Sequence, residues 1–171
     1  MIDRVLIDTL KIKSRDFASR WKDSIRKHPQ LKHYNEMDDD ALIDSDAEVY
    51  KLLSRTLDRG LDRSLVGDFF VDTGKKRMRE GFPVSEVIFA LGLIQKTVIE
   101  YLMTSFAPEN PMRMYQSMGA LTRVADFCLL GSFYISKGFL EETYTHMSRH
   151  DKVSDEFLKK YFKDDFFFKD E

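Results

Sequence analysis

The sequence contains few of the residues that cross-link or interrupt a chain. Its 171 residues include one cysteine and four prolines. A single cysteine excludes an intrachain disulfide, so the hydrophobic core must hold the fold, and it suits a reducing compartment. Cys128 stands in the apolar segment "DFCLLG". This setting predicts a buried, unreactive thiol and not a catalytic nucleophile.

The sequence also lacks an excess of charge of one sign and a long apolar run. It has 27 basic and 29 acidic residues, with a formal net charge of −2. Such a balance gives no bulk attraction to nucleic acid or to an anionic membrane. No apolar run approaches the roughly 18 residues of a membrane span, and the charged N-terminal segment is unlike a signal peptide. We therefore expect a cytoplasmic protein that binds neither nucleic acid nor a membrane.

Strand signals are scarce, because no two alternating β-branched runs are joined by an Asn-Gly or Asp-Gly turn. Apolar residues instead recur at helical spacing, and the prolines fit helix boundaries. We predict an all-α fold, one domain over residues 1–171 with about six to seven helices. The helix over about 112–135 is expected to be the most buried one. The first predicted helix covers about 2–27, with an interruption near Ser14 or Asp16. A connection at 27–40, with one short turn at 31–34, leads to a second helix that runs to about 59. The others cover about 62–80, 83–106, 112–135, 139–149 and 154–162, with a break near Gly138.

Four glycines follow one another at intervals of seven residues, at positions 60, 67, 74 and 81. The first and last flank a predicted helix and can cap helices. Gly67 and Gly74 lie inside that helix, where each costs about 1 kcal/mol relative to alanine. Together with Val71 they form a stripe of small side chains, which lets another backbone approach closely. The pattern predicts a close helix crossing, either inside the fold or between two subunits.

The segment "REGFPVSEVIFALGLIQK", residues 79–96, predicts a tight corner between two helices. Gly81 can end the first helix in the left-handed conformation. Pro83 can begin the second, and Glu86 in its first turn complements the helix dipole. A connection this short makes the two helices packed, roughly antiparallel neighbours.

Candidate metal sites are incomplete. The acidic run "MDDDALIDSDAE", residues 37–48, fits no calcium-loop register and indicates a helix N-terminus. His146 and His150 are four residues apart, with Glu142 one turn earlier, and such a pair can share a zinc ion. No recognisable motif supplies a third ligand, so a polar helix face is the favoured interpretation. Haem ligation by one of the four histidines stays open, although nothing fixes an axial histidine over an apolar pocket.

Other polar and aromatic features leave the chemistry equally open. Arg123 and Asp126, three residues apart, can form a polar pair that is either structural or ligand-facing. The C-terminal aromatic block, Phe166, Phe167 and Phe168, is expected to dock on the core or on a partner. The sequence contains no phosphate-binding loop, nucleophile elbow or dinucleotide fingerprint. We therefore expect no catalysis and no cofactor.

The segment "MREGFPVSEVIFALGLIQKTVIEYL", residues 78–102, resembles part of the helical N-terminal domain of RsbT co-antagonist proteins, the sensory halves of bacterial stress-signalling assemblies. Related segments occur in PucR-type transcription regulators and beside some sensor kinases. The shared features are a basic helix end, Gly81, Pro83, Glu86 and the apolar helix that follows. An upstream "W…HP.L..Y" followed by an acidic helix start, at residues 21–46, is compatible. The resemblance covers about residues 15–135.

The resemblance implies a helical, globin-like or bundle domain that dimerises, has no catalytic residues and passes a signal to an attached module. The chain ends at Glu171, without room for the phosphorylatable output domain, so a free-standing sensor, an adaptor or a fragment is expected. We predict a non-catalytic signalling or regulatory domain that forms a homodimer and contacts a protein partner. The alternatives are a small-ligand sensor, a haem- or metal-binding protein or enzyme, and the ligand-binding half of a transcription factor, for which a basic recognition helix is missing.

Overall fold

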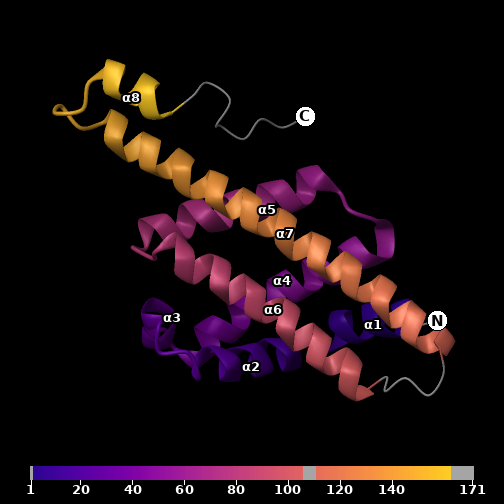
Figure 1. The fold of residues 1–171 in the computed structure, drawn as a ribbon. Helices are drawn as coiled ribbons and strands as arrows, with labels where there is room; N and C mark the ends of the chain where they lie inside the picture. The colour runs from indigo at the N-terminus through magenta and orange to yellow at the C-terminus, as the bar shows by residue number, and fades with distance from the viewer. Residues whose placement is uncertain (1, 106–110, 163–171) are drawn as a thin grey trace. The chain divides into compact units, whose positions relative to one another are not determined.

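The computed structural model describes residues 2–105 and 111–162 of the chain (Figure 1). These residues form a bundle of eight α-helices and no strand, so the predicted all-α fold class is confirmed. The helix count is one higher than the upper end of the prediction. The helices are α1 (Ile2–Ile12), α2 (Ser14–Ile25), α3 (Lys32–Glu36), α4 (Asp39–Arg59), α5 (Arg63–Arg79), α6 (Val84–Ser105), α7 (Pro111–Ser148) and α8 (Asp155–Tyr161).

The described helices form two compact units, and each unit combines two separate stretches of the chain. Unit 1 comprises Met1–Asp62 and Phe89–Leu129, and unit 2 comprises Arg63–Ile88 and Leu130–Glu171. Unit 1 therefore contains α1 to α4, most of α6 and the first half of α7. Unit 2 contains α5, the first turn of α6, the second half of α7 and α8. The aromatic block at residues 166–168 lies outside the described residues.

Helix α7 differs most from its prediction. It runs without interruption for 38 residues, from Pro111 to Ser148, so the predicted break near Gly138 is wrong. Gly138 has helical backbone, and the only described glycines with positive φ are Gly60 and Gly81. The expectation that this helix is the most buried is also wrong. In its most apolar stretch 33% of the residues are buried, against 44% in α6.

Helices α6 and α7 are long and apolar enough to span a membrane, by length and composition alone. The core helices of soluble proteins share this composition, because a helix buried on most sides is apolar on most sides. The absence of membrane contact therefore stays a prediction.

Aromatic side chains fill the core of unit 1. The ring of Phe17 on α2 lies 5.3 Å from that of Tyr50 on α4 and 5.0 Å from that of Tyr101 on α6, between ring centroids. The buried indole of Trp21 packs edge-on against Tyr34, and its Nε1 donates to the backbone oxygen of Ala90 at 2.8 Å. Apolar burial therefore joins α2 to α3, α4 and α6, and the indole hydrogen bond fixes the register of α2 on α6.

Local polar contacts begin α4 within this unit. The Asp38 carboxylate caps the helix by accepting from the backbone N–H groups of Asp40, at 3.0 Å, and Ala41, at 3.3 Å. Asp39 accepts from Arg26 at 2.7 Å and from Lys22 at 3.4 Å. Hydrogen bonding from Arg26 and then Lys22 lowers the pKa of Asp39. The first part of the acidic run thus serves the helix N-terminus, as predicted.

Candidate functional site

The small-residue stripe of α5 packs against α7 inside unit 2. A Cβ atom added to Gly74 would meet the carbonyl oxygen of Ile135 and would lie 3.2 Å from the Cα of Gly138. A Cβ atom added to Gly138 would meet the carbonyl oxygen of Val71 and would lie 3.1 Å from the backbone nitrogen of Lys75. The two helices therefore touch backbone to backbone, with a glycine from each at the crossing.

The other residues of the stripe are buried, and ion pairs flank the crossing. Val71 is buried on α5, and Gly67 is buried two turns before Gly74. Lys75 pairs with Glu141 of α7 at 2.6 Å, and Glu141 is itself buried. Arg79 pairs with Glu142 at 2.9 Å. The two ion pairs therefore lie beside the α5–α7 crossing, where the two backbones touch and no side chain fits between them.

The corner at residues 81–86 has the hydrogen bonds of a Schellman motif. Gly81 has φ +84°, its N–H donates to Met78, and the N–H of Phe82 donates to Arg77. The motif usually carries an apolar contact between the residues at its two ends. Here the buried Arg77 guanidinium lies over the Phe82 ring, 4.7 Å from its centroid, and pairs with Glu80 at 2.9 Å. The corner is a rigid structural element.

The start of α6 completes the corner. The carbonyl of Pro83 accepts from the N–H of Glu86 at 3.1 Å and from that of Val87 at 3.4 Å. The Glu86 side chain is buried and lies in the first turn of the helix. A carboxylate at this place complements the positive end of the helix dipole.

The predicted polar and histidine pairs lie at the surface. Arg123 and Asp126 are both exposed on α7, so the structure does not place them in an apolar interior. His146 and His150 are exposed near the end of that helix. Among the described residues, no three His, Cys, Asp or Glu side chains come together in a way that could hold a metal ion.

Sequence reasoning missed an acidic residue in the core of unit 1. Asp46 of α4 is only 3% exposed, and its Oδ2 atom has no hydrogen-bond partner among the described residues. Burial in this apolar surrounding raises the pKa of Asp46 well above its ordinary value. The signal was present in the sequence, because Asp46 falls on the apolar stripe of α4 between Leu42 and Tyr50 at four-residue intervals.

Two further buried groups accompany Asp46. Burial, and then the charge of Asp46, raise the pKa of the fully buried Tyr50 hydroxyl, while Thr97 on α6 partly offsets the increase. The same two causes raise the pKa of the Cys128 thiol on α7 to about 12. A thiol with this pKa is unreactive at neutral pH. Cys128 is thus buried, as predicted.

One side of α7 carries several exposed apolar side chains. Five large apolar side chains of this helix, each between 47% and 77% exposed, lie within about 60° of one another around the helix axis. They are Tyr115, Met118, Leu129, Phe133 and Leu140. We call this set the α7 face. Isolated exposed apolar residues are ordinary, but five of them on one side of a single helix indicate an interaction surface.

The spacing within the α7 face is regular. Met118, Leu129 and Leu140 are separated by eleven residues each. Eleven residues make slightly more than three full turns, so such a row stays nearly straight along the helix. A straight apolar row suits packing against a second long helix.

Comparison of the chain with protein-family models, with curated proteins and with solved structures finds no match.

Proposed function

We propose that this chain is a non-catalytic sensor or regulatory module that acts through self-association and through contacts with a signalling partner. The α7 face is the observation that carries the proposal, because it places five large apolar side chains in water on one helix. The resemblance of residues 78–102 to helical sensor domains supports the signalling role.

A second copy of the chain fits the α7 face by the order of its side chains. Two α7 helices packed antiparallel, with the two-fold axis at Leu129, would set Leu129 against its own counterpart. Met118 would then face the partner's Leu140, and the small Ala125 would face the large ring of the partner's Phe133. In this register a large side chain faces a small one, and apolar side chains face apolar side chains. A two-fold interface requires such self-complementarity. No like charges face each other in this register.

The size of the surface limits the strength of this contact. The α7 face runs from Tyr115 to Leu140, about 40 Å at 1.5 Å per residue. A strip of that length and of about one helix diameter covers roughly 400 Å², about half of the roughly 800 Å² that each partner contributes to a standard interface. The α7 face alone therefore supports a weak dimer, which forms at high protein concentration.

The test is the mass of the protein in solution. We expect the wild-type chain to sediment at about twice its monomer mass of 20.1 kDa. Leu129→Asp places a charge at the proposed two-fold axis, and should weaken the dimer at least about tenfold, or about 1.4 kcal/mol. Ile12→Asp is the matched control, because Ile12 is 79% exposed on α1 and outside the α7 face. A monomeric wild-type protein at high concentration, or a Leu129→Asp variant that dimerises normally, would contradict the proposal.

A further inference from the structure

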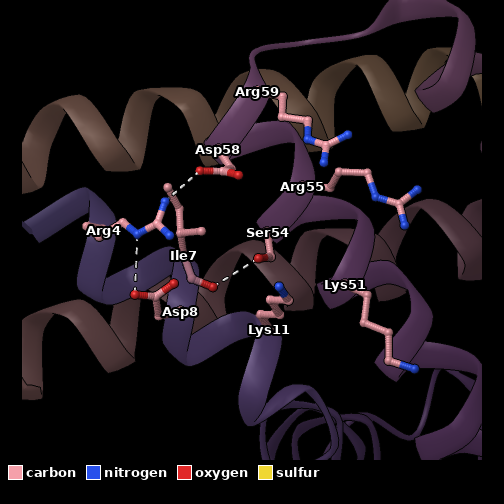
Figure 2. Close-up of a pocket in the computed structure, with 9 residues that line it drawn as sticks. All are labelled: Arg4, Ile7, Asp8, Lys11, Lys51, Ser54, Arg55, Asp58 and Arg59. Carbon is pink, nitrogen blue, oxygen red and sulfur yellow. Dashed lines mark hydrogen bonds and ion pairs between the residues drawn. The ribbon is translucent and has the colours of Figure 1, made fainter.

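Unit 1 contains a cleft between α1 and α4 with a volume of about 450 Å³ (Figure 2). This volume lies in the range of small-molecule sites. Its lining is unusually basic for a chain with a net charge of −2. The lining residues are Arg4, Ile7, Asp8 and Lys11 from α1 and Lys51, Ser54, Arg55, Asp58 and Arg59 from α4.

The two carboxylates of the cleft are engaged by one of its five cations. Arg4 lies 3.4 Å from Asp8, between Nε and Oδ2, and 2.9 Å from Asp58, between Nη1 and Oδ1. The Arg4–Asp58 contact joins α1 to α4, and the Arg4–Asp8 contact lies within α1, as the dashed lines in Figure 2 show. The charge of Arg4 balances one of these two carboxylates, and with five cations and two carboxylates the lining keeps a net charge of about +3.

Three of the remaining cations have no acidic partner. Lys51 pairs with Glu48, outside the lining, at 2.6 Å. In the part of the chain that the structure describes, no ion pair involves Lys11, Arg55 or Arg59. Arg55 and Arg59 are one turn apart and extend from the same side of α4 in Figure 2. Cations held close together without counter-charges repel one another, and an anion relieves that repulsion.

The base of the cleft is fixed by packing and a hydrogen bond. Ile7 and Ser54 are both buried, and the Ser54 hydroxyl donates to the carbonyl of Ile7 at 2.9 Å. This bond ties α4 to α1 below the charged rim. The rim is therefore carried by two packed helices and not by a loop, so the backbone that presents the basic side chains is already in place without a ligand.

We propose that this cleft binds the phosphate chain of a small, multiply phosphorylated molecule. Guanidinium groups donate paired hydrogen bonds that match phosphate oxygens, and the lysine ammonium groups add charge. The site goes beyond the proposed function, because none of its residues belongs to the α7 face. In a sensor, this cleft would bind the signal molecule, whose chemical class the dimer contact alone does not indicate.

The experiment is calorimetric titration with inorganic tripolyphosphate and, separately, with ATP, at low and at physiological salt. We expect binding that weakens with salt. Arg55→Gln and Arg59→Gln should each weaken it about tenfold, since each removes charged hydrogen bonds. Arg20→Gln is the matched control, because Arg20 is exposed on α2 in the same unit and outside the cleft. Its affinity should stay within about twofold of wild type.

The titration distinguishes a nucleotide ligand from a bare phosphate chain, and it can also overturn the proposal. Tighter binding of ATP than of tripolyphosphate would assign part of the site to a nucleoside, and equal binding would assign it to the phosphate chain alone. No binding at low salt, or an equal loss in Arg20→Gln, would overturn the proposal. Tighter binding of an oligonucleotide or an acidic peptide, with the same variants affected, would overturn it in favour of a macromolecule. Repeating the titration on Leu129→Asp shows whether binding is independent of self-association.

Discussion

The two units hold their helices together by different means. In unit 1, rings such as Phe17, Tyr50 and Trp21 fill the space between helices. In unit 2, α5 and α7 meet through Gly74 and Gly138, with backbone against backbone. A core of side chains can adjust rotamers around a change, whereas a backbone contact has nothing that can move aside. Unit 2 should therefore be the less tolerant of added volume.

The two units also place polar groups differently. Unit 1 keeps Asp46 and the hydroxyl of Tyr50 inside its core, with polar atoms that lack partners among the described residues. Unit 2 places its charges beside the helix crossing and pairs them, as Lys75 is paired with Glu141. A buried polar atom without a partner costs free energy of folding. Unit 1 thus contains a source of instability that is not found among the described residues of unit 2.

The largest effect expected from this comparison is that of Gly138→Leu. The new side chain would meet the backbone of Val71 and Lys75. Overpacking costs about 1–3 kcal/mol even where side chains can yield. We therefore expect a loss of about 3 kcal/mol or more, and a melting temperature lower by about 6 °C or more. Thermal denaturation measures the loss, and hydrogen exchange should localise it to α5 and the second half of α7.

Gly119→Leu is the control for this variant. Gly119 lies on the same helix in unit 1, and nothing lies within 4 Å of a Cβ atom built there. It makes the same chemical change without the collision, so its melting temperature should not fall and should rise by about 2–4 °C, since leucine favours the helix over glycine by about 1 kcal/mol. Equal losses in the two variants would remove the distinction between the units.

The sequence predicted the α5 side of the crossing better than the α7 side. Gly67, Val71 and Gly74 form a stripe that is visible as a seven-residue repeat. Gly138 has no such repeat around it, and a lone glycine in an apolar segment is equally compatible with a helix break. Only the approach of α5 shows that Gly138 removes a side chain and does not end a helix. That approach is a tertiary contact, which periodicity along one segment does not contain.

Neither the buried Asp46 nor the basic cleft was predicted from the sequence, and the reasons differ. Asp46 stands in a run of acidic residues, and the run as a whole is typical of a helix N-terminus. Its position on the apolar stripe of α4 indicated burial, but the acidic composition of the whole run favoured an exposed helix N-terminus instead. The cleft depends on Arg4 and Asp58, which are 54 positions apart and meet only when α1 packs on α4. The sequence pattern of a single helix therefore includes only about half of the cleft lining, and it does not show that α1 and α4 come together.

The next effect is that of Asp46→Asn, which tests the buried polar group of unit 1. The pKa of Asp46 is raised in the folded state, whereas an unfolded aspartate has a pKa of about 3.9. Above that value the unfolded state releases the proton that the folded state retains. The contribution of Asp46 to the free energy of unfolding should therefore be most favourable below about pH 4 and should fall as the pH rises toward the folded pKa.

Asp46→Asn abolishes this titration. We expect the variant to melt a few degrees higher than wild type at pH 7 and to lose the decline in stability above about pH 4. Denaturant unfolding between pH 4 and pH 8 measures both effects. Asp44→Asn is the control. Asp44 lies two residues before Asp46 in the sequence, is exposed and pairs with Arg15, and an exposed ion pair contributes little to stability. If the two variants show the same pH profile as wild type, the Asp46 carboxyl is not what limits unit 1.

The smallest effect is that of Gly92→Ala, and it sharpens the comparison most directly. Gly92 is exposed within α6 in unit 1, with nothing within 4 Å of a built Cβ atom. Alanine there should add about 1 kcal/mol of helix stability and about 2–4 °C in melting temperature. The same substitution at Gly74 should lower the melting temperature, because its methyl group would meet the carbonyl of Ile135. Opposite signs would show that helical glycines weaken unit 1 and are required in unit 2; a gain from both would mean that the crossing has room for a methyl group.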